Sequence, residues 1–142
     1  MYGALDISTS GLVAQRMRLT AISANIANRD TLVDENGQVR PYRARQVLFA
    51  PGDPSAKSAE GRALGVHVAD VRVDDTPFRY KFDPGSPLAD KSGPYKDYVA
   101  LPSVDPVTEQ MNAFEASRAY EANIVAAEAT KSMIAQALRL LA

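Results

Sequence analysis

The chain has 142 residues, of which 16 are basic, 17 are acidic and 46% are hydrophobic, so its formal net charge is −1. This length fits one domain, or one small domain with an insertion. The balanced charge argues against a nucleic-acid binder and against a polybasic membrane anchor, because both need an excess of Lys and Arg. The chain has no cysteine, which excludes disulfides and thiolate metal sites.

The N-terminal segment has neither a basic region nor a continuous apolar run, so we do not expect a cleaved signal peptide. No stretch approaches the roughly 18 apolar residues that a membrane-spanning helix needs. If the protein leaves the cytoplasm, we expect it to keep its N-terminus, and we predict no membrane insertion.

The helix breakers divide the chain into three parts. Of the 8 glycines and 9 prolines, 14 lie between Arg29 and Ser103, and none follows Pro106. We therefore predict a mainly α fold, in which two long terminal helices form an antiparallel, coiled-coil-like pair around a small β-hairpin or sheet insertion. The predicted parts are residues 1–28, 29–103 and 104–142.

The first helix is predicted at about residues 4–27. An apolar stripe repeats along it every seven residues, with one further member at helical spacing, as in a coiled coil. The stripe consists of Leu5, Leu12, Leu19, Ile22 and Ile26. Gly11 weakens the helix by about 1 kcal/mol relative to Ala.

The middle part is predicted to hold short strands. Residues 42–49 and 66–73 are compatible with β structure, and a phase shift in the second run indicates a bulge near residues 69–70. Three aromatic residues that alternate with basic ones predict a half-buried strand; they are Phe78, Tyr80 and Phe82. Residues 51–65 are rich in Gly, Pro and Ser and are expected to form a loose surface loop.

The last helix is predicted to start at Pro106, with Asp105 as its N-cap, and to run for about 36 residues, or roughly 54 Å. It is apolar on two opposite faces. The Met111 face holds Val107, Met111, Phe114, Ala122, Val125, Ala129, Met133 and Leu140. The Ile124 face holds Ala113, Tyr120, Ile124, Ala127, Ile134, Leu138 and Leu141.

The first helix can cover only one of these two faces. An exposed apolar strip of such length is unusual on a monomer, so we predict that neighbouring subunits cover the other. The alternative is that the middle part of the same chain covers it. Arg118 lies within the Met111 face and needs a partner, either Glu115 or Glu121 nearby or a group on a neighbouring chain. The predicted subunit interface comprises Leu5, Leu12, Leu19, Ile22, Ile26, Met111, Phe114, Arg118, Tyr120, Ile124, Val125, Met133, Ile134 and Leu138.

No pattern in the sequence points to catalysis. His67 is the single histidine and has no partner at a recognisable triad spacing, and a zinc site needs more nitrogen or sulfur ligands than the chain has. We interpret Asp53, Asp74 and Asp75 as surface charges. We therefore predict no enzyme activity, no metal and no cofactor.

Two motifs resemble those of a known family. Residues 10–19, with the pattern SGLxAQxxxL, and Asn25-Ile26-Ala27-Asn28 resemble the N-terminal motif of the flagellar axial proteins, which are the rod, hook and hook-associated subunits. Tyr42-Arg43-Ala44 resembles its continuation. Residues 117–124 (SRAYEANI) and Lys131-Ser132-Met133 are similar to the C-terminal motif of the same family. The short length and residues 83–90 and 101–105 most resemble a proximal-rod member.

The resemblance implies a structural subunit of the bacterial flagellar rod, a tube that transmits torque and surrounds the export channel. The family is exported unfolded by type III secretion, without a cleaved signal, into the periplasmic part of the basal body. The implied partners are other rod proteins, further copies of this chain, the MS-ring adaptor and the export gate. The alternative hypothesis is a cytoplasmic helical adaptor or export chaperone.

Overall fold

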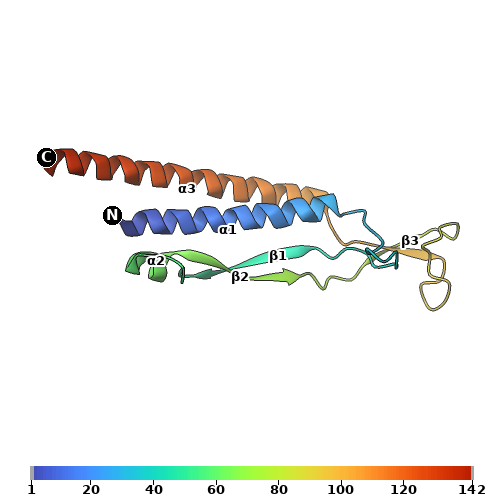
Figure 1. The fold of residues 1–142 in the computed structure, drawn as a ribbon. Helices are drawn as coiled ribbons and strands as arrows, with labels where there is room; N and C mark the ends of the chain where they lie inside the picture. Colours follow the sequence, from blue (N-terminus) through green and yellow to red (C-terminus); the bar gives the residue numbers. More distant parts are fainter. Residues whose placement is uncertain (1, 142) are drawn as a thin grey trace.

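The computed structural model describes residues 2–141, and the order of its elements confirms the predicted fold class. Two long helices at the ends of the chain enclose a small β insertion (Figure 1). The elements are α1 (Tyr2–Ala27), β1 (Arg45–Pro51), α2 (Ala59–Leu64), β2 (Val66–Val73), β3 (Arg79–Phe82), β4 (Tyr98–Leu101) and α3 (Pro106–Leu141).

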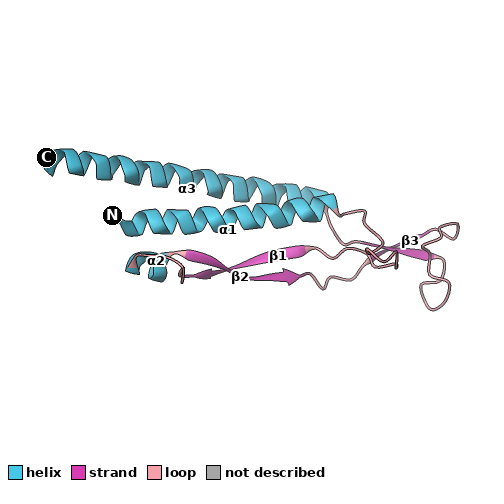
Figure 2. Ribbon diagram, in the orientation of Figure 1, coloured by secondary structure: helices cyan, strands magenta, loops and turns pink. Residues whose placement is uncertain are grey.

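The molecule is elongated, and α1 is its middle layer (Figure 2). On one side α1 packs along α3, and on the other it packs against the β1–β2 hairpin and α2. The β3–β4 pair lies at one end, away from the N-terminus of α1 and the C-terminus of α3 (Figure 1). Among residues 2–141, α1 is thus covered on two sides, whereas α3 packs mainly along α1.

The two long helices are antiparallel, and their register is constant. A Cβ atom added to Gly11 would lie 2.7 Å from Oδ1 of Asn123, which shows how closely the helices approach there. Arg18 faces Glu115 at 3.4 Å. Small residues allow this approach, since Gly11 is buried and Ala116 of α3 is 0% exposed. Gly11 lies opposite Asn123 in this antiparallel pair, so the start of α1, nine residues earlier, lies near residue 132, and the end of α3 extends past α1 (Figure 1).

The β1–β2 hairpin is antiparallel and contains the predicted bulge. Leu48 pairs with Asp70 and Phe49 pairs with Val68, so Ala69 is the extra residue. β1 starts at Arg45, later than the predicted residue 42. The reason is that Tyr42 is held elsewhere: its backbone N–H donates to the carbonyl of Thr31, in the segment that follows α1, and its hydroxyl donates to Oδ1 of Asn25 on α1, both at 3.0 Å.

The prediction of a loose loop at residues 51–65 is wrong in part, because the segment contains α2. Ser58 caps this helix by accepting a hydrogen bond from the Gly61 N–H at 3.0 Å. The Ser58 N–H donates to the Asp6 carboxylate of α1 at 2.9 Å. Hydrogen bonding by the side chain and backbone of Ser58 lowers the pKa of Asp6. Gly61 is buried against Asp6, where a side chain would not fit. Tertiary contacts with α1 therefore order a segment whose composition is typical of a loop.

The prediction of a half-buried strand at residues 78–82 is also wrong, because every residue of β3 is exposed. Within residues 2–141, β3 pairs with β4 alone, in a two-stranded sheet. The aromatic rings shield one another instead. Tyr80 stacks on Tyr95 with ring centroids 3.9 Å apart, and Phe82 meets Tyr98 edge-on at 5.2 Å.

Candidate assembly interface

The start of α3 is fixed by Asp105, as predicted. Its Oδ1 accepts a hydrogen bond from the Val107 N–H at 3.2 Å, and its Oδ2 accepts one from the Thr108 hydroxyl at 2.7 Å. These hydrogen bonds favour the ionised carboxylate and lower the pKa of Asp105. The cap therefore fixes the residue at which α3 begins.

The Ile124 face is the one that α1 covers. Ala113, Tyr120, Ile124, Ala127 and Ile134 are all partly buried. Leu138 belongs to the same face but is 62% exposed, because it lies beyond the end of α1. The side chain of Leu141 is outside the described residues. Ala116 and Thr130, which the sequence did not single out, are buried beside this face.

The Met111 face lies open along the whole of α3. Its large apolar side chains are between 58% and 88% exposed. They are Val107, Met111, Phe114, Val125, Met133 and Leu140. No segment of the described chain covers this strip, so the alternative that the middle part covers it is wrong. An apolar strip on a helix of about 54 Å is the kind of surface that marks a protein–protein interface.

Arg118 lies exposed beside this open face. Neither of its predicted local partners pairs with it within residues 2–141, since Glu115 pairs with Arg18 of α1 instead. Of the two predicted kinds of partner for Arg118, the local one is therefore wrong.

The heptad stripe of α1 lies at the border of the helix pair. Ile22 is buried, whereas Leu5, Leu12, Leu19 and Ile26 are partly exposed. The centre of the contact is made by small and polar residues, including Gly11, which lies against Asn123, and the buried Ser8. One residue of the predicted stripe is therefore buried, and the other four flank the contact between α1 and α3.

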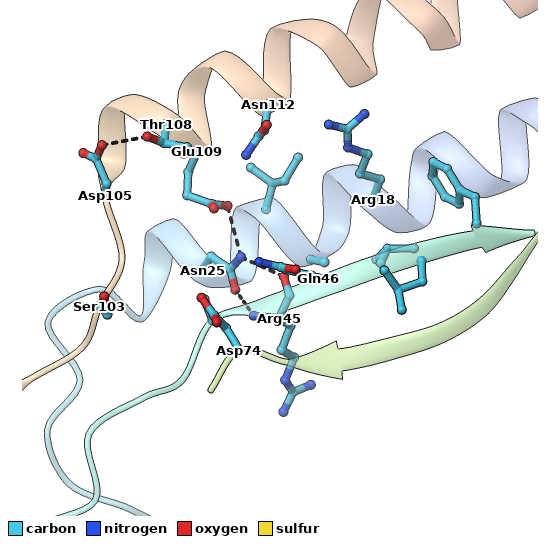
Figure 3. Close-up of a pocket in the computed structure, with 16 residues that line it drawn as sticks. Arg18, Asn25, Arg45, Gln46, Asp74, Ser103, Asp105, Thr108, Glu109 and Asn112 are labelled. Carbon is cyan, nitrogen blue, oxygen red and sulfur yellow. Dashed lines mark hydrogen bonds between the residues drawn. The ribbon is translucent and has the colours of Figure 1, made fainter. Parts of the chain in front are cut away.

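Asn25 is 2% exposed near the end of α1, and its side chain makes four hydrogen bonds (Figure 3). Its Nδ2 donates to the Arg45 carbonyl and to the Glu109 carboxylate, both at 3.0 Å. Its Oδ1 accepts from the Arg45 N–H at 2.8 Å and from the Tyr42 hydroxyl at 3.0 Å. Burial raises the pKa of Tyr42, so this hydroxyl keeps its proton and remains a donor.

One amide therefore joins α1, β1 and α3, with all four of its hydrogen-bonding positions occupied. The sequence singled out Asn25 and Tyr42 only as parts of a family motif. The sequence signal for their role is an amide at the end of an apolar helix, because a buried amide needs hydrogen-bond partners.

The part of the chain that the structure describes shows no grouping of residues typical of a metal site, and its single histidine has a structural role. His67 Nδ1 lies 2.6 Å from the Gly52 carbonyl, a contact that holds the ends of the hairpin together. Within residues 2–141, no three His, Asp or Glu residues are grouped so as to hold a metal ion. Over the same residues, no helix has the length and apolar character that a membrane crossing requires.

Comparison with known proteins identifies the class. Residues 5–32 match the family described as "Flagella basal body rod protein". The chain is 38% identical to the flagellar basal-body rod protein FlgC of Borreliella burgdorferi over 150 aligned positions, covering 99% of this chain and 97% of that protein. It is 42% identical to FlgC of Salmonella typhimurium, with 95% of this chain and 93% of that one aligned. The FlgC protein of Bacillus subtilis is 38% identical, with 98% and 97% covered.

The fold and its open helix face thus belong to a flagellar basal-body rod protein, a structural protein and not an enzyme. Within that class, the chain belongs to the FlgC family.

Proposed function

We propose that the chain assembles into the proximal rod through the Met111 face of α3, which packs on neighbouring subunits to form the wall of a tube. The observation that carries this proposal is the exposure of that face along the full helix, while the opposite face is already covered by α1. Burying such side chains stabilises an interface by roughly 25 cal/mol for each Å² removed from water.

The same proposal assigns a role to the end of α3. Its last two turns extend past α1 and are apolar on both faces, with Met133, Leu138 and Leu140 exposed. A neighbouring subunit that packs there would cover them. Stiffness against torque would then come from helices that are each held on two sides.

Several finer assignments belong to this proposal. We expect further copies of this chain and other rod proteins as lateral and axial neighbours, and the MS-ring adaptor and export gate as neighbours at the base. The subunit would reach the periplasmic part of the basal body through the type III export channel, unfolded and with its N-terminus intact. Membership of the rod family argues against the cytoplasmic chaperone.

The test uses purified hook–basal bodies from cells that carry a single version of the chain, analysed by quantitative mass spectrometry. The unaltered chain is expected at stoichiometric level in the rod. Val125→Asp should be lost from it, because an unpaired buried charge costs about 3–5 kcal/mol. Lys57→Ala, on an exposed loop, is the matched control and should be incorporated normally. Normal incorporation of Val125→Asp would refute the interface.

A further inference from the structure

The outer edge of β1 has backbone groups that the hairpin does not use. The Ala44 carbonyl accepts from the Asp74 N–H at 2.8 Å, and the Gly52 N–H donates to the Gly65 carbonyl at 2.7 Å. In an antiparallel ladder, successive residues direct their N–H and C=O groups alternately toward the partner strand and away from it. The register on each side of the bulge therefore turns four residues outward; they are Arg45, Val47, Phe49 and Pro51.

The two ends of this edge are closed. At Arg45, the Asn25 amide bonds both the N–H and the C=O, as a neighbouring strand would. At Pro51 there is no N–H to offer. Val47 and Phe49 lie between these ends, and within residues 2–141 neither has a hydrogen-bond partner outside the hairpin. The open part of the edge is thus two outward-facing residues, about 7 Å apart.

A groove of about 500 Å³ runs along this open edge (Figure 3). Its other walls are α1, through Arg18 and Ile22, and the start of α3, through Thr108 and Asn112. All of residues 44–49 line the groove. A strand that presented one face would contribute alternate residues, so the unbroken run indicates that the edge itself faces the groove. Phe49 is 37% exposed, so its ring is available to an incoming side chain.

We propose that this groove receives an extended segment of a neighbouring rod subunit, which adds as a short strand to β1 at Val47 and Phe49. The inference rests on the proposed assembly into the rod and deepens it by naming a second, independent contact. An extended backbone offers N–H and C=O groups at the spacing of these two residues. A helix does not, because its own backbone groups are paired internally. The Asn25 amide and Pro51 set the limits of the strand, so three or four residues of the neighbour suffice.

The test compares two substitutions of one residue. Val47→Pro removes the outward N–H, and the β1–β2 ladder keeps all its hydrogen bonds because proline is tolerated at an outward edge position. Val47→Thr has a similar shape and keeps the N–H. Both full-length variants carry p-benzoylphenylalanine at Phe49, and the photo-cross-linked peptides are identified by mass spectrometry in purified hook–basal bodies.

In the chain with Val47 intact, we expect a cross-link to a segment of a rod subunit. Its yield should fall about fivefold in Val47→Pro, the equivalent of one hydrogen bond, and should be unchanged in Val47→Thr. A rod-incorporated chain that gives no such cross-link, or one that Val47→Pro does not weaken, overturns the strand addition and leaves the Met111 interface standing. If circular dichroism shows that Val47→Pro does not fold, the cross-link from the chain with Val47 intact decides the test. A cross-link to a segment of a rod subunit supports the strand addition, and its absence overturns it. Absence of the unaltered chain from the rod overturns both proposals.

Discussion

The side-chain amide of Asn25 donates a hydrogen bond to the carboxylate of Glu109, 3.0 Å away across the two long helices. The same amide bonds both backbone groups of Arg45. This contact fixes how the start of α3 lies relative to the end of α1. Since α3 runs on for more than 30 residues, a small rotation at this point would displace the Met111 face along its whole length.

Asn25→Ala should lower the free energy of unfolding by about 3 kcal/mol, because it leaves the Arg45 backbone groups, the Tyr42 hydroxyl and the Glu109 carboxylate without their partner. Urea unfolding of the purified chain measures it. Asn28→Ala is the control: it removes two hydrogen bonds, one to the Ala24 carbonyl and one from the Thr31 hydroxyl, at a partly exposed residue, and should cost about 1 kcal/mol. Equal costs for the two substitutions would contradict the central role of Asn25.

A negative charge at position 25 should lower the free energy of unfolding mainly by repelling the Glu109 carboxylate. Asn25→Asp places a second carboxylate beside it, so it should destabilise the chain as much as Asn25→Ala does. Adding Glu109→Gln should recover about 1 kcal/mol, since the amide can donate where two carboxylates would repel. A double-mutant cycle measured in urea tests this, and strictly additive effects would show that the two residues are not coupled.

Gly11→Ala should destabilise the helix pair even though alanine favours a helix by about 1 kcal/mol. The added Cβ would lie 2.7 Å from Oδ1 of Asn123, so α3 or the Asn123 side chain has to move. Combining it with Asn123→Ala should restore stability to at least that of Asn123→Ala alone. Thermal unfolding of the four chains is the measurement, and a Gly11→Ala chain that melts higher than the parent would contradict the close contact.

Substitutions of the adjacent residues Ile124 and Val125 should affect different properties, the first the stability of the isolated chain and the second its assembly into the rod. Ile124→Asp puts a charge between α1 and α3 and should lower the melting temperature of the isolated chain by about 5–10 °C. Val125→Asp places the same charge on an exposed position and should leave the melting temperature nearly unchanged while it blocks incorporation into the rod. If Val125→Asp destabilised the isolated chain as strongly as Ile124→Asp, the assignment of the two faces would be wrong.

Amide hydrogen exchange should differ along α3 in the isolated chain. Residues 133–141 extend past α1 and should exchange much faster than residues 112–125, because an unsupported helix end has little stability of its own. In purified hook–basal bodies the two segments should be similarly protected. Fast exchange of residues 133–141 in the assembled rod would show that no neighbour covers them.

Acid should weaken the cap of α3. The pKa of Asp105 is lowered from 3.8 in the folded chain, so its contribution is fully present above the unfolded pKa and is lost as the pH falls through the folded value. Asp105→Asn keeps a capping side chain without a titrating charge. The stability difference between the two chains should therefore shrink between about pH 5 and pH 2, as followed by circular dichroism. A difference that stays constant over this range would mean that the charge of Asp105 is not involved.

The sequence by itself determined the two long helices, the cap at Asp105, the bulge at Ala69 and the presence of two apolar faces on α3. These features depend on local propensity and on the period of the apolar residues, which the order of residues contains directly. The concentration of 14 of the 17 Gly and Pro residues between Arg29 and Ser103 likewise indicated the three-part layout.

Only the tertiary structure decided which face of α3 stays open, where α2 forms and what Asn25 does. These depend on residues distant in the chain. Gly11 meets Asn123 and Ser58 meets Asp6, and no periodic pattern encodes such pairs. Both faces of α3 look alike as sequence, because apolar side chains follow the same spacing whether α1 or a neighbouring subunit covers them. The difference between them arises from the contacts between α1 and α3, such as the Asn25–Glu109 hydrogen bond, which place the Ile124 face against α1.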